Sequence, residues 1–308
     1  MSSSALIAVA AQLGGVALAP LLPGLVQTAK ARLQGRRGPS PLQPYRTLRR
    51  LWSKSSVAPA GTGAVYRVAP PLIAACMLIA LALVPIAGRG PDLGVGHDAL
   101  VLVGMLALAR FAAAAAAWDT GNGFALMGAA RDAMIAVFGE ALLVLALLVA
   151  ALPARSTDLR SMAAAAAGGH VWGQAAHWCG AIAFLLVVLV ETGRQPIDNP
   201  DTHLELTMIH EGPLLEYAGR DLAYLQWAAA ARHWVMLVLG AQLFLPHPAG
   251  FAGALAALVV AGLAQCLGLA VIETAQAKMR VLRVPALLGL GCAVALAGVA
   301  TAIAGLAA

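Results

Sequence analysis

The sequence has few charged and few aromatic residues, and its cysteines are isolated from one another. Charged residues make up 11% of the 308-residue chain and aromatic residues 5%, whereas hydrophobic residues make up 61%. Soluble domains contain about 25% charged residues, so this composition excludes a soluble globular protein. Because there is no CxxC pair and no cluster of histidines, we expect this chain to bind no iron–sulfur cluster and no metal, and any redox centre to belong to a partner. The four cysteines are Cys76, Cys179, Cys266 and Cys292.

Long apolar runs dominate the remaining sequence and predict a polytopic membrane protein. Crossing a hydrocarbon layer of roughly 30 Å takes about 20 helical residues. The strand alternation of an outer-membrane barrel is missing, so helices must satisfy the backbone in lipid. We therefore predict an all-α bundle of about eight spans that forms a single transmembrane domain over residues 1–308. The eight runs are approximately Ala5 to Val26, Val68 to Ala87, Ala99 to Ala117, Ala133 to Leu152, Val171 to Val190, Leu225 to Leu245, Phe251 to Ile272 and Pro285 to Leu306.

Basic residues are distributed unevenly among the connections, and this predicts the orientation. Lys and Arg near span ends stay on the cytoplasmic side of a membrane. The odd-numbered connections contain fifteen of them and the even-numbered connections three. We therefore expect both termini on the periplasmic side of a bacterial inner membrane, with loops 28–67 and 191–224 in the cytoplasm. The net charge of +6 follows from this bias, so we expect no nucleic-acid partner.

The N-terminal run is expected to be a span and not a signal peptide. Met1 to Ser4 carries no positive charge, and the apolar run after it has full length.

The first cytoplasmic connection contains no acidic residue from Thr28 to Arg67. Within it, apolar and aromatic residues recur at helical spacing with cations between them, which predicts an interfacial amphipathic helix. Such a helix is either a lipid anchor or a docking surface for a cytoplasmic subunit. The apolar positions are Leu42, Tyr45, Leu48 and Trp52, and the cations are Arg46, Arg49, Arg50 and Lys54.

The second long connection holds seven of the fourteen acidic residues, between Glu191 and Asp221. Asn199 and Pro200 suit the start of a short helix on which Asp201 and Glu205 would share a face. Repulsion between two such carboxylates raises the pKa of at least one unless a cation intervenes, and Arg194 is the nearest in sequence. The alternative is a solvated acidic loop, but the acids alternate with apolar residues.

A metal site in this loop is not expected. His203 and His210 lie near Glu205 and Glu211, but an HExxH motif is missing because position 214 is Leu.

Ionisable residues inside the predicted spans are the stronger functional signal, because a charge in the bilayer is costly and marks an ion pathway or a buried pair. Arg110 and Glu140 each lie about seven residues from the cytoplasmic ends of their spans, so they could pair at a depth near 10 Å. Arg232 and Glu273 also fall in cytoplasmic halves. Together with the acidic loop they predict a charged cavity that opens inward. For Glu140 the alternative is a neutral acid hydrogen-bonded to a neighbouring helix.

The motif ETGRQPIDNPDTHLEL resembles the acidic loop of the membrane subunit of the complex I superfamily, the family of respiratory NADH dehydrogenase subunit 1. The matching positions are Glu191, Arg194, Pro196, Asp198, Pro200, Asp201 and Glu205, then Glu216, Tyr217 and Gly219, and in the first loop Arg37, Gly38, Pro39, Pro44 and Tyr45. The segments LTMIHEGPLL, EYAGRDLA and AKMRVLRVP resemble formate hydrogenlyase subunit 4 and the membrane component of group 4 nickel-iron hydrogenases.

This resemblance implies a non-cofactor membrane subunit with no complete catalytic site of its own. The implied partners are hydrogenase small and large subunits, a ferredoxin-like subunit and antiporter-like membrane subunits, with the nickel-iron site and iron–sulfur clusters in those partners. The implied ion-coupling residues are Glu140, Glu191, Arg194, Asp198, Asp201, Glu205, Glu216 and Glu273, and the docking residues are Arg37, Tyr45, Arg46 and Arg49.

Two alternatives remain open. A quinone-site subunit of an NADH:quinone oxidoreductase would need an apolar tunnel from the bilayer to the acidic loop. A stand-alone transporter should show an inverted repeat and broken helices, and we detect no such repeat.

Overall fold

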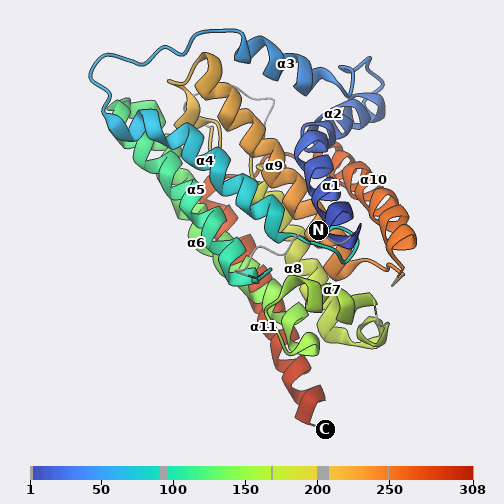
Figure 1. The fold of residues 1–308 in the computed structure, drawn as a ribbon. Coiled ribbons are helices and arrows are strands. Elements are labelled where there is room, and N and C mark those ends of the chain that lie inside the picture. Colours follow the sequence, from blue (N-terminus) through green and yellow to red (C-terminus); the bar gives the residue numbers. More distant parts are fainter. Residues whose placement is uncertain (1–2, 91–95, 168, 200–207, 249, 308) are drawn as a thin grey trace.

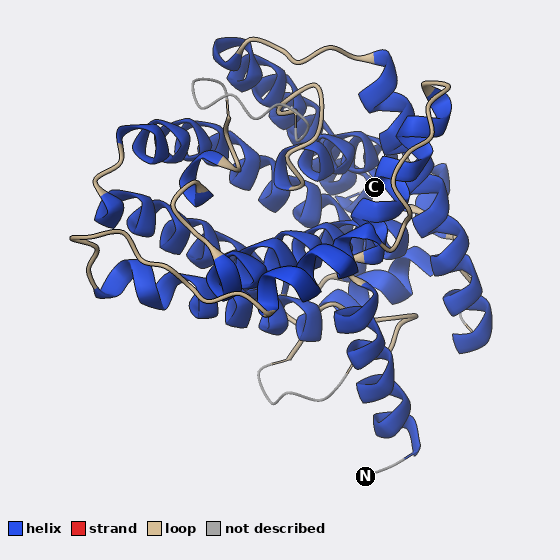
Figure 2. Ribbon diagram, turned by 90° about the horizontal axis from the view of Figure 1, so that it is seen from above, coloured by secondary structure: helices blue, strands red, loops and turns tan. Residues whose placement is uncertain are grey.

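The chain folds as an assembly of helices, which confirms the all-α prediction. The computed structural model describes residues 3–90, 96–167, 169–199, 208–248 and 250–307, and in these ranges the only β pairings are two isolated bridges. Figure 2 shows helices throughout, joined by loops. The α-helices are α1 (Ser3–Leu18), α2 (Leu21–Leu33), α3 (Gln43–Trp52), α4 (Ala64–Leu83), α5 (Ala99–Thr120), α6 (Gly123–Ala154), α7 (Leu159–Ala167), α8 (Ala175–Glu191), α9 (Gly219–Phe244), α10 (Phe251–Ala275) and α11 (Val284–Ala307). Short 3-10 turns are η1 (His170–Gly173), η2 (Gly212–Leu214) and η3 (Val281–Arg283).

Several of these helices can cross a membrane. In the described part of the chain, α4, α5, α6, α10 and the segment Val281–Gly305, which contains most of α11, are long and apolar enough, and α1 with α2 make a sixth if the bent pair is one span. Helix α8 is apolar but shorter, and α9 carries Arg232, His233 and Gln242. Each of the eight predicted runs overlaps a helix, whereas the count of eight spans stays a prediction.

The first predicted run is broken, with a bend of 46° between α1 and α2. Pro20 lies at the break, where it offers no N–H to continue the helical hydrogen bonds, and Pro23 follows within the first turn of α2. Helix α2 then continues to Leu33, beyond the predicted start of the first loop at about residue 28.

The bundle has two distinct ends, and α3 covers one of them (Figure 1). We call this end of the bundle the basic end. Four connecting segments lie together there: the α3–α4 connection, the α5–α6 turn, the described parts of the α8–α9 loop and the α10–α11 connection. The Asp119 side chain accepts from Gly63 N–H at 2.9 Å, and Met279 N–H donates to Pro196 O at 2.8 Å. Helix α3 matches the predicted amphipathic helix. Helix α7 lies at the opposite end.

Packing within the bundle follows the apolar faces. Helix α4 packs against α5 and α9, α11 packs against α6 and α8, and α10 packs mainly against α2. Apolar side chains such as Val259, Val260 and Leu263 on α10 are exposed, as suits a helix that faces lipid.

Helix α6 begins ten residues before the predicted span, and this difference affects the site. Asn122 caps it by accepting from Phe124 N–H at 2.8 Å, and Gly121 turns the chain with a φ of +65°. Residues 123–132 therefore form a helical extension rather than a loop.

Candidate functional site

Arg110 on α5 is the centre of a group of five charged side chains from four helices. The Arg110 guanidinium lies 2.7 Å from Glu140 on α6, 2.7 Å from Glu191 at the end of α8 and 3.4 Å from Asp132 on α6. Arg232 on α9 lies 3.2 Å from the second oxygen of Glu191. We call these five residues the arginine cluster. The possible pairing of Arg110 with Glu140 is confirmed, and Glu191 joins the same group.

Close helix packing makes the arginine cluster possible. A Cβ at Gly139 would lie 2.9 Å from Cγ1 of Val190, so only glycine lets α6 and α8 approach this closely. Glu140 and Glu191 directly follow these two positions. The glycine therefore brings the two carboxylates within reach of one arginine.

The arginine cluster contains three carboxylates and two guanidinium groups, so it carries one net negative charge when all are ionised. A buried charge without a partner is costly, and the nearest further cation is the His210 side chain, whose Nε2 lies 3.6 Å from Asp132. The Glu191 side chain is 1% exposed and contacts both arginines, whereas the Glu140 side chain is 34% exposed and contacts one. Glu140 is therefore less enclosed by cations than Glu191.

A second buried site centres on Glu273 at the end of α10. Its side chain is 0% exposed and lies 2.9 Å from Arg194 and 3.0 Å from Lys30 on α2. Arg194, in the loop after α8, therefore contacts a carboxylate at the end of α10. Its expected partners Asp201 and Glu205, and the helix predicted to start at Pro200, lie outside the described residues.

Asp198 and His210 connect the loop to the arginine cluster. Asp198 lies 2.7 Å from Nζ of Lys278 and 3.3 Å from Nδ1 of His210, whose Nε2 lies 3.6 Å from Asp132. An imidazolium, with an N–H on both nitrogens, fits between the two carboxylates. Gly193 makes room for this ring, because its φ is +60° and a Cβ there would lie 3.0 Å from Nδ1 of His210.

The environment shifts the pKa values of both loop residues. Burial alone would raise the pKa of Asp198, but hydrogen bonds from His210 and Lys278 outweigh it and hold that pKa well below its usual range. Burial would lower the pKa of His210, but its hydrogen bond to Asp198 and the negative charge of Asp132 raise it above the ordinary value. Both shifts favour the charged forms of the pair.

Together these contacts form a continuous series of charged groups from the loop into the bundle. It runs through Asp198, His210, Asp132, Arg110 and then Glu140 or Glu191. Sequence reasoning missed Asp132, because this residue precedes the predicted fourth span. The available signal was the Asn122 cap, which makes position 132 helical and puts it about two turns before Glu140.

Glu216 lies apart from this series. Its carboxylate accepts a hydrogen bond from the Asn122 amide, and its carbonyl oxygen accepts from the Tyr66 hydroxyl at 2.7 Å. Tyr217 stacks on Tyr66 with ring centroids 4.2 Å apart, and its hydroxyl donates to Tyr66 O at 2.8 Å. These contacts hold the end of the loop against α4 and the α5–α6 turn.

The residues expected to dock a partner differ in their surroundings. Tyr45 donates its hydroxyl to Ala17 O at 2.6 Å, so it also fixes α3 to the end of α1. Arg37, Arg46 and Arg49 are exposed at the basic end.

A cavity of about 550 Å³ at the basic end gives access to the loop. It lies between α2, α3, the loop and α9, and its lining includes Gln27, Arg194, Asp198, His210 and His233. The cavity contains charged residues of the loop, but the four ionisable span residues that were predicted to share it, Arg110, Glu140, Arg232 and Glu273, do not line it. In the described part of the chain, no group of three His, Cys, Asp or Glu side chains is arranged to hold a metal ion.

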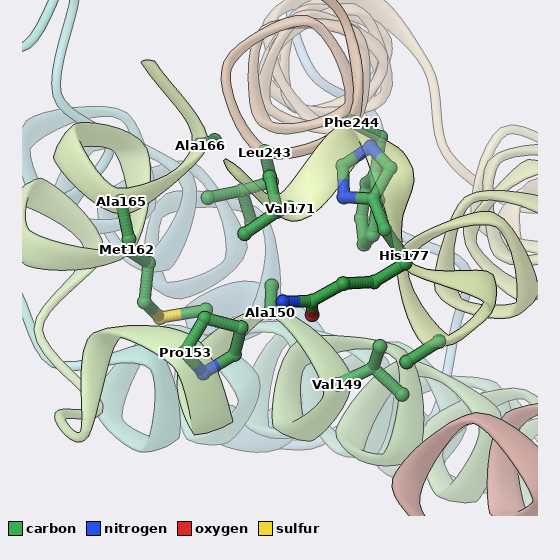
Figure 3. A pocket seen from close by; sticks show the side chains of 12 residues that line it. Val149, Ala150, Pro153, Met162, Ala165, Ala166, Val171, His177, Leu243 and Phe244 are labelled. Atoms are coloured by element: carbon green, nitrogen blue, oxygen red, sulfur yellow. The ribbon is translucent and has the colours of Figure 1, made fainter. Parts of the chain in front are cut away.

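A small space at the opposite end can be excluded as a ligand site. Figure 3 shows His177, Phe244 and Val171 around it, and its volume is about 10 Å³, which is no more than one water molecule needs.

The fold and the charged series define the class of this protein, a polytopic membrane protein with ionic residues buried between helices at its basic end. A family model described as NADH dehydrogenase matches residues 5–305, so the chain belongs to this family. The resemblance to the membrane subunit of complex I is thereby confirmed.

Individual relatives come from both branches of the family. The chain is 33% identical to formate hydrogenlyase subunit 4 of Escherichia coli over 282 residues, 86% of this chain and 87% of that protein. It is 35% identical to hydrogenase-4 component C of the same organism over 74% of this chain and 71% of that protein. It is also 34% identical to an H-type subunit of NADH-quinone oxidoreductase from Cereibacter sphaeroides, over 74% of this chain and 75% of that protein.

A solved structure confirms the fold. A chain of the membrane-bound sulfane sulfur reductase, an archaeal respiratory membrane complex, superposes with a TM-score of 0.82 and 19% identity, covering 98% of this chain and 100% of that one.

Proposed function

We propose that this chain is the membrane-anchoring and ion-coupling subunit of a hydrogenase or formate hydrogenlyase-type complex. In this role it docks the iron–sulfur small subunit at the basic end and links electron transfer to movement of protons or sodium ions. The nickel-iron site and the iron–sulfur clusters belong to the partners. The basic end would face the cytoplasm, with both termini on the periplasmic side of the inner membrane.

One observation carries the coupling role: the series of charged groups from Asp198 to Glu140. The arginine cluster has one more carboxylate than it has guanidinium groups, and a protonated His210 beside Asp132 balances this charge. A change of charge near Asp198, caused by electron transfer in a docked subunit, would shift that proton by electrostatics.

The lateral position of Glu140 supports contact with an antiporter-like subunit. The side chains of Glu140, Asp132 and Glu191 are 34%, 15% and 1% exposed, so Glu140 is the most exposed carboxylate of the arginine cluster. A membrane partner packed against α6 could therefore exchange a proton with it.

The hydrogenase branch is favoured by the longer match to formate hydrogenlyase subunit 4. The quinone-site alternative keeps one supporting observation, because Leu48 lines both the polar cavity and an apolar groove beneath α3. An apolar molecule could approach the loop along this side.

Co-purification tests the assignment. The tagged chain is solubilised from its native membrane in mild detergent, its partners are identified by mass spectrometry, and hydrogen evolution is measured in the same fraction. A nickel-iron large subunit with activity is expected. Flavin-bearing NADH dehydrogenase modules with quinone would establish the alternative instead, and a solitary chain would contradict both.

The Glu140→Gln variant tests the coupling role. Hydrogen evolution by the solubilised complex should persist, while hydrogen-linked ion uptake into inverted membrane vesicles should be lost. Asp221→Asn, which removes a carboxylate at the basic end outside the charged series, is the matched control and should retain uptake. Normal uptake by Glu140→Gln would refute the proposed relay.

A further inference from the structure

A groove of about 630 Å³ lies between α3, α4 and α9. Figure 1 shows α3 across the end of the bundle, and the groove is lined by residues of α3 and its C-terminal cap together with residues of α4 and α9. Its volume is within the range of about 300–1,000 Å³ that is usual for small-molecule sites. It does not include the charged residues of the proposed relay.

The walls of the groove are divided into a polar rim and an apolar interior. Leu48 and Trp52 lie one turn apart on α3, and Leu78 on α4 and Trp227 on α9 continue the apolar surface. Trp52 packs edge-on against Tyr224, with ring centroids 5.1 Å apart. Tryptophan and tyrosine favour the level of the lipid headgroups, so this aromatic pair indicates where the membrane interface lies.

Arg49 in the last turn of α3 and Ser53, the C-cap residue of this helix, form the polar rim. Both are exposed, and none of the described residues that line the groove is acidic. The rim therefore offers the Arg49 cation to a ligand headgroup, whereas the Ser53 hydroxyl donates to Arg50 O at 2.9 Å. The surrounding chain strengthens the positive field, because no acidic residue occurs from Thr28 to Arg67.

We infer that the groove binds one anionic phospholipid of the adjacent leaflet, with its phosphate at Arg49 and its acyl chains along Trp52, Leu78 and Trp227. The guanidinium provides paired N–H donors for phosphate oxygens. The apolar wall provides the contact surface for the chains. The lipid would thereby join α3 to α4 and α9 and fix the position of the amphipathic helix.

Lipid binding to the solubilised native complex tests this inference. The complex is delipidated by detergent exchange and titrated with phosphatidylglycerol or phosphatidylcholine, and bound lipid is counted by native mass spectrometry. We expect one phosphatidylglycerol to bind in preference to phosphatidylcholine. Arg49→Gln should weaken phosphatidylglycerol binding about fivefold, the factor expected for one arginine beside an anionic lipid.

Two further variants separate the groove from general basic charge. Arg50→Gln removes a neighbouring exposed cation that does not line the groove and should leave binding unchanged. Leu78→Trp fills the groove from its exposed side and should abolish tight binding of the lipid chains.

Equal binding by wild type, Arg49→Gln and Leu78→Trp would overturn the inference. Equal loss in Arg49→Gln and Arg50→Gln would also overturn it, because it would show a diffuse charge effect. Recovery of a quinone and no phospholipid from the native complex, lost in Leu78→Trp, would assign the groove to a different occupant.

Discussion

Replacing Glu273 with glutamine should destabilise the protein by leaving two buried cations without their shared carboxylate. Lys30 and Arg194 lie 3.0 and 2.9 Å from its two oxygens, and the three side chains are 9%, 7% and 0% exposed, in the order Lys30, Arg194, Glu273. Removing one partner from a buried ion pair costs about 3–5 kcal/mol. The three side chains together carry one net positive charge in the wild type and two in Glu273→Gln.

A second substitution makes this prediction specific. Lys30→Met in the Glu273→Gln background restores the wild-type net charge, so it should recover part of the lost stability, with a coupling energy of about 0.5–3 kcal/mol. Lys54→Met removes an exposed cation elsewhere and is the control. The four corners of the cycle are the wild type, Glu273→Gln, Lys30→Met and the double variant. The midpoint of thermal unfolding of each tagged protein is followed by fluorescence-detected size exclusion.

The electrostatic reasoning would be refuted by either of two results. Glu273→Gln could unfold at the wild-type midpoint, which would show that water already screens the site. Lys30→Met could restore no more stability than Lys54→Met, which would show that the loss comes from packing and not from charge.

Three other predictions concern the arginine cluster and its connection to the loop. Gly139→Leu should separate α6 from α8, because even a Cβ at this position would lie 2.9 Å from Val190. Such overpacking costs about 1–3 kcal/mol or more. A lower midpoint of thermal unfolding is expected, and an unchanged midpoint would contradict the close approach of the two helices. His210 has its pKa raised by Asp198 and Asp132 against the effect of burial, so its stabilisation is complete below the ordinary value near 6.5 and is lost as pH rises through the raised folded-state value. His210→Gln should therefore flatten the fall in thermal midpoint above about pH 6.5, and a slope equal to wild type would disprove the contact. Asn122→Ala removes both the cap of α6 and the hydrogen bond to Glu216, so it should cost at least about 1 kcal/mol, measured as a midpoint shift. No shift would mean that other contacts hold the helix start.

The positions of most helices could be predicted because apolar runs of sufficient length have few alternatives in a membrane. The same criterion failed at the start of α6, where Arg131 and Asp132 resemble a loop although the Asn122 cap begins a helix. It also missed the bend at Pro20, because composition averages over a single proline.

The candidate site was only partly predictable. Charged residues within spans identified Arg110, Glu140 and Glu273 as members of a buried network. Their partners depend on tertiary packing, since Arg110 contacts residues 30 and 81 positions away along the chain. Whether Arg194 turns toward the loop or toward Glu273 depends on the position of α10 beside α2, which no local pattern encodes.

The sharing of Arg110 among several helices has a consequence for biogenesis. When α5 enters the bilayer, an arginine at its centre costs about 2.5–3.5 kcal/mol on the scale of translocon insertion. Glu140 follows 30 residues later, and the turn at Gly121 and Asn122 lets α5 and α6 insert as a helical hairpin that already contains this ion pair. Glu191 arrives only after a further stretch of synthesis and completes the group. The order of residues along the chain thus allows the arginine to be neutralised in steps as the protein is made, and a chain truncated before α6 should insert α5 poorly.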